Sequence, residues 1–385
     1  GDNDTFPLWY NLDVEGFRTD ARVCNFSYLQ TDWYIDQMKR PAYNSPALPI
    51  SWKRIQYVSG TNEAVPVNPS AKEELLDLYR RYPEQAKEIY GEDPFDIKNI
   101  IKYWILSEDK DQHFVPTDTV YLYIDKDAVR RSGMMLASED IPEKMAISLA
   151  GKRMLYKSDL MLLEMLATNN WERPIYIAIS VGEENYLNLG DNFVREGLVD
   201  RITPFNTKAE GTKNFDTEKT YNNVMNRFKY GGVKTKGIYL DETVKRMCYT
   251  HRQLMATLAL RLIDEGKNDK ALAVLKKSET ELPFENVPLI YVGGGLDMAK
   301  AYARLGMKSK AIDYINALWK NSTQYLEYYL SLNSNQFALS MSQCLREFYM
   351  LGNINQATQE IDSSIAEKQM DKLELYQELY EKRGG

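Results

Sequence analysis

The residues best suited to chemistry lie in the first forty positions of the 385-residue chain. Acidic side chains and large aromatic rings are dense there, and the candidate ligand-binding set comprises Asp2, Asn3, Asp4, Trp9, Tyr10, Glu15, Arg18, Asp20, Asp32, Trp33 and Tyr34. Carboxylates bind hydroxyl groups or metal ions, and flat aromatic rings stack on the apolar faces of sugars. This combination predicts a site for a sugar or a phosphate. A set of helix caps and core aromatic residues is the alternative.

Asp2, Asn3 and Asp4 form the pattern Asp-x-Asp, which many glycosyltransferases use to hold a divalent cation against the diphosphate of a nucleotide-sugar. The same spacing recurs twice between residues 109 and 127, in stretches typical of solvated turns, so the bare pattern has little specificity. The two carboxylates could instead orient an acceptor hydroxyl or cap the N–H groups of a following helix. We expect no resident cofactor, and a divalent cation at Asp2 and Asp4 is the one metal that the sequence offers.

The four tryptophan and tyrosine rings of the candidate set have two interpretations. They could form a stacking platform for a sugar or a peptide, or they could fill the core beside a strand. Arg18 is expected either to pair with Asp20 or to contact a phosphate. Both interpretations stay open at the level of sequence.

The elements that must position these residues follow from the apolar patterns. Strands are predicted over residues 21–29, 51–60, 120–124 and 174–180, and helices over residues 32–39, 70–79, 96–107 and 157–167. A helix followed by a buried strand occurs twice. This order predicts an α/β domain over residues 1–205, with a mixed, partly parallel sheet and flanking helices.

The remaining chain has a different pattern. Residues 206–240 are polar and predict a linker, and residues 241–385 carry apolar helical periodicity. Three glycines are each followed five residues later by an alanine: Gly266 and Ala271, Gly306 and Ala311, Gly352 and Ala357. Glycine permits a tight turn and alanine permits close helix packing, so the spacing predicts an all-α domain of tetratricopeptide-like helical hairpins. Such repeats would bind a protein or peptide partner.

Composition excludes several classes of function. The net charge of −7 disfavours nucleic acid and anionic membrane surfaces as main partners. No apolar run approaches the roughly 18 residues that a spanning helix needs. Only two histidines occur, His113 and His251, and they lie far apart in the sequence, so neither a catalytic histidine dyad nor a His-Glu-x-x-His zinc site is expected. Three widely spaced cysteines do not form a disulfide framework.

Two blocks, GDNDTFPLWY at residues 1–10 and TDWYI at residues 31–35, resemble the signature of a family of bacterial multi-spanning membrane proteins, domain of unknown function (DUF) 2723. The residues between the two blocks follow the same signature at Glu15-Gly16, Arg18, Asp20 to Val23, Asn25, Ser27 and Leu29. Mild departures occur at Ala21 and Cys24. Weaker matches, TNNWERPIYI and EGLVDRITPF, extend the resemblance to about residue 205. That family is considered similar to protein O-mannosyltransferases, which use lipid-linked sugars.

The resemblance implies a parent protein attached to the membrane through spanning helices that precede Gly1. It also implies a strand before Gly1, which would leave GDND at a strand's carboxyl edge, where open α/β sheets bind ligands. The catalytic carboxylate of such transferases lies in a loop between spanning helices, so the isolated chain is expected to be inactive.

These expectations combine into one leading function. The chain would be the soluble, extracytoplasmic (periplasmic) carboxyl-terminal region of a membrane glycosyltransferase-like protein. It would assist binding of the acceptor or the lipid-linked sugar, while its helical repeats bind a protein. A non-catalytic scaffold acting through the repeats is the alternative, and a free-standing metal-dependent transferase using Asp-x-Asp is a third.

Overall fold

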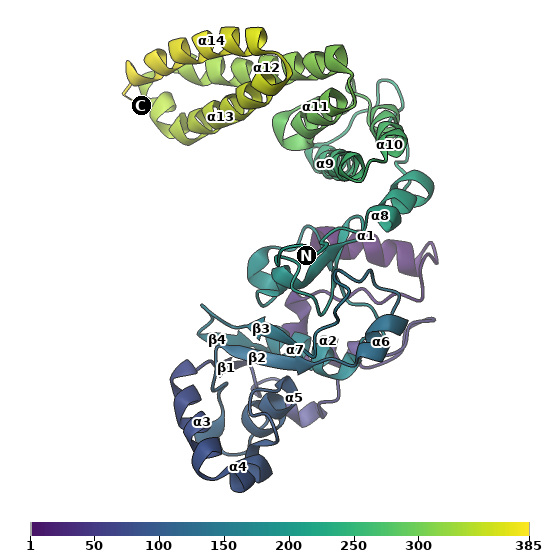
Figure 1. Cartoon of the computed structure of the whole chain (residues 1–385), viewed down its shortest axis with the longest axis vertical. Coiled ribbons are helices and arrows are strands. Elements are labelled where there is room, and N and C mark those ends of the chain that lie inside the picture. The colour runs from purple at the N-terminus through teal and green to yellow at the C-terminus, as the bar shows by residue number, and fades with distance from the viewer. Residues whose placement is uncertain (1, 385) are drawn as a thin grey trace. The chain divides into compact units, whose positions relative to one another are not determined.

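The computed structural model describes residues 2–384, with side chains from Asp4 to residue 384. The chain divides after Asp216 into two compact units (Figure 1). The first combines helices and short strands and is here named the mixed unit, whereas the second, the helical unit, contains no strand among its described residues. The division lies inside the segment 206–240 that was predicted as a linker.

Short helices and shorter strands alternate along the mixed unit. Its helices are α1 (Asp2–Asp13), α2 (Asp32–Met38), α3 (Lys72–Arg81), α4 (Pro83–Tyr90), α5 (Ile97–Ile100), α6 (Lys126–Arg131) and α7 (Lys157–Asn169). Its strands are β1 (Ala64–Pro66), β2 (Thr119–Tyr123), β3 (Lys144–Ser148), β4 (Met154–Tyr156), β5 (Tyr176–Ala178), β6 (Phe193–Arg195) and β7 (Val199–Ile202). The helix predicted over 32–39 and the strands predicted over 120–124 and 174–180 are therefore confirmed as α2, β2 and β5.

The strands form three small sheets: β1 with β4, β2 with β3, and the order β5-β7-β6. Every pairing between these strands is antiparallel, so the predicted partly parallel sheet is wrong. A parallel pair needs a long crossover between its strands. Here β6 and β7 are joined by a tight hairpin, in which the N–H of Glu196 donates to the carbonyl of Val199 at 2.9 Å.

The core of the mixed unit is organised around α7 and not around a sheet. A helix was predicted there with one apolar face, but α7 is buried on nearly all sides. Its polar residues have partners inside the fold: the Lys157 ammonium lies 2.6 Å from Glu63, and Glu164 accepts the N–H of Ser51 at 2.7 Å. A buried charge is tolerated when it is paired in this way.

Two predicted strands, over residues 21–29 and 51–60, are wrong. Only short 3₁₀ helices form there, Ser27–Gln30 and Arg54–Gln56. In the first segment a side chain satisfies the buried backbone, because the N–H of Asn25 donates to the Tyr34 hydroxyl at 2.8 Å. A backbone group paired with a side chain does not need a strand partner.

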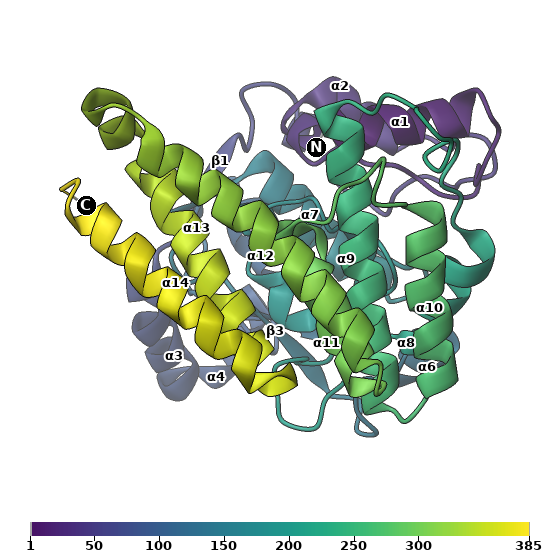
Figure 2. The ribbon, with the colours of Figure 1, turned by 90° about the horizontal axis from the view of Figure 1, so that it is seen from above.

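The helical unit is a succession of longer helices (Figure 2). They are α8 (Thr217–Asn222), α9 (Glu242–Asp264), α10 (Asn268–Glu281), α11 (Gly295–Arg304), α12 (Lys308–Ser331), α13 (Ser334–Ile361) and α14 (Ser363–Glu381). Consecutive helices form three pairs, α9 with α10, α11 with α12 and α13 with α14. In addition α12 packs extensively on α13, and α11 contacts α9 and α13. Among the described residues, no helix is both long enough and apolar enough to cross a membrane.

Two turns of the helical unit have the same geometry. Gly266 follows α9 with φ +74°, and Gly306 follows α11 with φ +77°. The N–H of each glycine donates to the carbonyl of the residue three positions earlier, at 2.9 Å in both turns. The N–H of the residue after each glycine donates to the carbonyl five positions earlier, at 2.7 Å in the first turn and 2.9 Å in the second. This double pattern is the Schellman motif, in which a left-handed residue closes the helix. Ala271 and Ala311 then lie fully buried in the first turn of the next helix.

The turn predicted at Gly352 is wrong, because α13 continues through it. Leu351, Ile354 and Ala357 are buried at helical spacing on both sides of the glycine, so the apolar face is unbroken. This packing outweighs the cost of about 1 kcal/mol for glycine inside a helix. The third pair of helices turns instead at Asp362, whose side chain accepts the N–H groups of residues 364 and 365.

A buried arginine closes the connection between α10 and α11. Arg252 on α9 is fully buried, and its guanidinium donates to the carbonyls of Leu282, Val287 and Pro288 at 2.9, 2.6 and 3.0 Å. Burial lowers its pKa to about 10. The guanidinium thus holds a loop whose carbonyls would otherwise be buried without donors.

Candidate functional sites

The amino-terminal motif begins a helix. Because α1 starts at Asp2, the described residues of GDND begin a helix, and the strand expected before Gly1 stays a prediction. The side chains of Asp2 and Asn3 lie outside the described residues. Asp4 accepts a hydrogen bond from the hydroxyl of Ser180 at 2.6 Å, which ties α1 to the segment after β5. No group of three or more acidic, histidine or cysteine side chains suited to a metal occurs among the described residues.

The TDWYI block divides into a core residue and a surface residue. The side chain of Tyr34 is fully buried, and its hydroxyl accepts the N–H of Asn25. The neighbouring Trp33 is 55% exposed, with its ring 5.4 Å from that of Tyr34 in an edge-on arrangement. Successive helical residues point in directions about 100° apart, so a surface helix separates them in this way.

Four rings form a continuous row, here named the aromatic row: Phe6, Trp9, Tyr28 and Trp33. The centroid distances are 5.8, 6.3 and 6.1 Å along the row. The two ends, Phe6 and Trp33, are more than half exposed, while the middle rings are half-buried. The ring of Tyr10 is also exposed on α1. Neighbouring exposed aromatic rings form an apolar patch, a feature that marks interaction sites when it is large.

Most polar candidates are engaged in local pairs. The Tyr10 hydroxyl donates to Glu15 at 3.0 Å. Arg18 and Asp20 form a two-pronged ion pair at 2.9 and 3.0 Å, and this hydrogen bond lowers the pKa of Asp20. Of the alternatives for Arg18, the structure thus contains the ion pair.

Asp32 serves the fold in a comparable way. It lies in the first turn of α2, accepts the N–H of Ser59 at 3.3 Å and faces the guanidinium of Arg54 at 3.5 Å. The structure therefore brings Trp9, Trp33 and Tyr34 together around Tyr28, whereas Asp20 and Asp32 are each engaged in separate local contacts.

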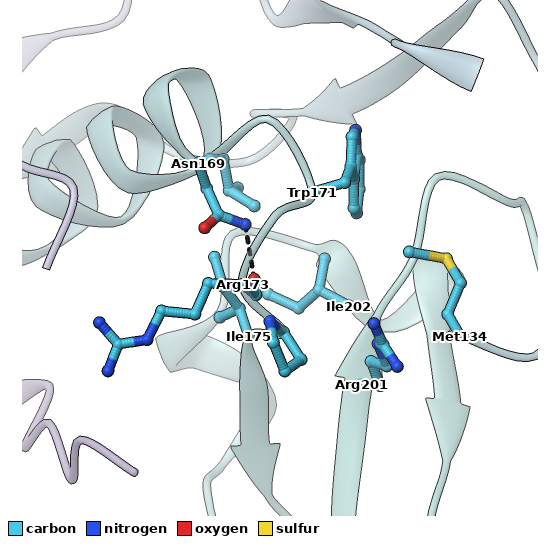
Figure 3. A pocket seen from close by; sticks show the side chains of 9 residues that line it. Met134, Asn169, Trp171, Arg173, Ile175, Arg201 and Ile202 are labelled. Atoms are coloured by element: carbon cyan, nitrogen blue, oxygen red, sulfur yellow. Dashed lines mark hydrogen bonds between the residues drawn. The ribbon is translucent and has the colours of Figure 1, made fainter. Parts of the chain in front are cut away.

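A small cavity lies where α7 ends beside the three-stranded sheet (Figure 3). Asn169 donates to the carbonyl of Arg173 at 2.7 Å across its wall, and Arg201, which is 3% exposed, donates to the carbonyl of Ser132 at 2.9 Å. The cavity volume of about 10 Å³ is at the limit of what one water molecule needs. The cavity is therefore a packing feature and not a ligand site.

The helical unit contains a larger opening, here named the cleft, of about 290 Å³. It lies among α9, α11, α13 and the 3₁₀ helix Tyr291–Gly293. Most of its lining side chains are polar or charged, and the full lining is Gln253, Tyr291, Val292, Gly294, Leu296, Asp297, Lys300, Asn353, Gln356, Ala357 and Glu360. A volume near 300 Å³ is at the lower end of the range for ligand pockets.

The floor of the cleft depends on a glycine. Gly294 has φ +78°, and a Cβ there would lie 2.8 Å from the Cα of Gln253, so only glycine lets α11 begin this close to α9. At the wall, the Gln253 amide donates to Asp297 at 2.7 Å. Asn353 donates to the main-chain carbonyl of Tyr349 at 2.9 Å, and burial is the main cause of the raised pKa of Tyr291. These contacts hold the lining in place.

Comparison with known proteins gives one family. Residues 1–220 match the family described as TMEM260-associated domain 2. The chain belongs to this family. No curated protein and no solved structure matches it. The TMEM260-associated domain includes the aromatic row and the small cavity, whereas the cleft lies in residues outside the match.

Sequence reasoning identified two of the four residues of the aromatic row within the TMEM260-associated domain, Trp9 and Trp33, and missed Phe6 and Tyr28. The cleft, which lies outside the TMEM260-associated domain, was not predicted from the sequence. One lining residue, Ala357, was named, but as part of a predicted turn. The run Gly293-Gly294-Gly295 was the signal that could have found it, because consecutive glycines mark a close approach of two backbones.

Proposed function

We propose that the chain is a binding region of a membrane glycosyltransferase-like protein. In this proposal the helical unit holds a polypeptide partner or substrate, and the TMEM260-associated domain assists binding of the acceptor or the lipid-linked sugar. The observation that carries the proposal is the polar cleft of about 290 Å³ in the helical unit.

We infer further that the helical unit consists of tetratricopeptide-like hairpins. Two observations support this reading: the matching Schellman turns at Gly266 and Gly306, and the contacts that α11 makes with the first helices of the neighbouring pairs, α9 and α13. The cleft lies among those same three first helices. Stacked helical hairpins use such a concave surface to bind partners.

The role of the TMEM260-associated domain rests on the aromatic row and on the resemblance to the DUF2723 family. Half-exposed rings offer flat apolar surface to a sugar or an acceptor peptide. The resemblance also supports the extracytoplasmic, periplasmic location and the attachment to a preceding membrane region. In this arrangement the chain binds and the membrane-embedded part carries out the transfer.

Sugar transfer by the membrane-embedded parent protein tests this role. We expect Trp33→Ala to raise the KM for the acceptor or the lipid-linked sugar about two- to tenfold, because stacking on a ring is worth about 0.5–1.5 kcal/mol beyond buried area and Trp33 ends the row. Tyr82→Ser is the matched control, since Tyr82 is also 55% exposed but lies outside the row. Equal KM values for the two variants would remove the aromatic row from the function.

Location is tested by fractionating cells and blotting with an antibody to this chain. A band much heavier than 44.6 kDa that stays with membranes and is lost to external protease supports an extracytoplasmic region of a membrane protein. A band near the mass of the chain, in the soluble fraction, contradicts the proposed attachment. The scaffold alternative would then be favoured, with the cleft as its functional surface.

A further inference from the structure

We propose that the cleft binds an extended polypeptide segment that inserts a lysine or arginine side chain. This inference rests on the proposed function, since it names the partner class of the helical unit. The cleft combines three carboxamides, two carboxylates and one ammonium group within a single opening of about 290 Å³.

The carboxamides suit a peptide backbone. Gln253 comes from α9, whereas Asn353 and Gln356 come from α13, so amides face the cleft from two helices. A carboxamide both donates and accepts hydrogen bonds, which matches the alternating N–H and C=O groups of an extended chain. Because Gln253 already donates to Asp297 at 2.7 Å, its orientation is fixed with its carbonyl oxygen as the remaining acceptor group.

The charges favour a cationic side chain. Asp297 on α11 and Glu360 on α13 contribute two negative charges to the lining, and Lys300 contributes one positive charge. The sum is therefore −1. Glu360 is exposed at the rim, where its charge meets an entering ligand before the ligand is desolvated. An inserted lysine or arginine would gain charge-assisted hydrogen bonds there.

The size and the shape of the lining favour a peptide over a sugar. Tyr291 supplies the one aromatic ring among the lining residues. Sugar sites use a ring face as a platform, whereas the buried lining residues here are Gly294, Leu296 and Ala357. Two of these three residues are small, which leaves room for one long side chain.

The test measures fluorescence anisotropy of labelled heptapeptide pools with the full chain. The pools are acetylated and amidated, with randomised flanking positions and a fixed central residue: arginine, glutamine or glutamate. We expect the arginine pool to bind about tenfold more tightly than the glutamate pool. Glu360→Lys should abolish this preference, and Glu374→Lys, an equal charge change at an exposed position on α14, should retain it.

A second variant, Gln356→Trp, fills the rim and should weaken binding of every pool. Peptide binding without a preference for arginine, or binding that neither variant changes, overturns the inference while polypeptide binding by the helical unit stands. Absence of binding by all three pools overturns both the inference and the proposed polypeptide role.

Discussion

The two units use their polar residues in different ways. In the mixed unit, the densest polar stretch of the sequence mostly serves local structure: Arg18 pairs with Asp20, and Asp32 accepts the N–H of Ser59. In the helical unit, polar residues that no motif marks line an open cleft. The comparison shows that a sequence stretch rich in polar and aromatic residues can serve the local fold as readily as a binding site. Single substitutions in each unit distinguish residues that stabilise the fold from residues that bind a ligand.

The largest effect is expected at Arg252. Arg252→Met leaves the carbonyls of Leu282, Val287 and Pro288 buried without their donor, which costs about 3 kcal/mol of helical-unit stability. Hydrogen exchange of amides in α9 and α11 measures this loss. Arg246→Met, an exposed change on the same helix, should stay within about 0.5 kcal/mol. Similar effects for both would show that the guanidinium does not hold the loop.

The TDWYI block provides the next comparison. Tyr34→Phe removes the buried acceptor of the Asn25 N–H and should cost the mixed unit about 1–2 kcal/mol. Trp33→Ser, one residue earlier but exposed, should cost about 0.5 kcal/mol or less. Urea denaturation followed by far-UV circular dichroism measures both. If Trp33→Ser proves the costlier change, the aromatic row is structural and its proposed binding role loses support.

The glycines of the helical unit should respond in opposite directions. Gly306→Ala places a Cβ at φ +77° and should destabilise the unit by about 1 kcal/mol. Gly352→Ala, at an exposed position inside α13 with open space around it, should stabilise the unit by about 0.5–1 kcal/mol. Thermal unfolding of the two variants distinguishes a true turn from a continuous helix. Destabilisation by Gly352→Ala would contradict the continuous α13.

The smallest expected effect appears only in acid. The pKa of Asp362 is lowered to about 2, mainly by the hydrogen bond from Lys308 and to a smaller extent by the hydrogen bond from Ser364. A carboxylate with a depressed pKa contributes stability above its ordinary pKa, and this contribution is lost as pH falls from about 4 to about 2. Asp362→Asn keeps a good helix cap but lacks the charge. The loss of stability that Asp362→Asn causes relative to the natural protein should therefore become smaller as pH falls from about 4 to about 2.

Unfolding monitored by hydrogen exchange of α14 amides at a series of pH values checks this expectation. Asp371→Asn, at an exposed position on the same helix, is the control. If the loss of stability in Asp362→Asn does not change with pH, the charge of Asp362 does not contribute to stability, and the prediction is wrong.

Sequence predicted the parts whose signal is local. The apolar period that gives α2 and α7, and the glycines after α9 and α11, are each contained in a few neighbouring residues. The prediction of a strand over 21–29 is wrong because an apolar stretch resembles a buried strand, whereas the hydrogen bond between Asn25 and Tyr34 depends on a helix that follows. The cleft was missed because Gln253, Asp297 and Asn353 meet only after the helices stack.

The floor of the cleft has an evolutionary and practical consequence. Because Gly294 brings the main chain of α11 directly against α9, the depth of the opening is set by backbone geometry and not by any side chain on its rim. Rim positions such as Gln356 and Glu360 are exposed and carry no packing duty toward that floor. Related chains can therefore exchange these residues to acquire new ligands, and a designer can recode the rim on an unchanged scaffold.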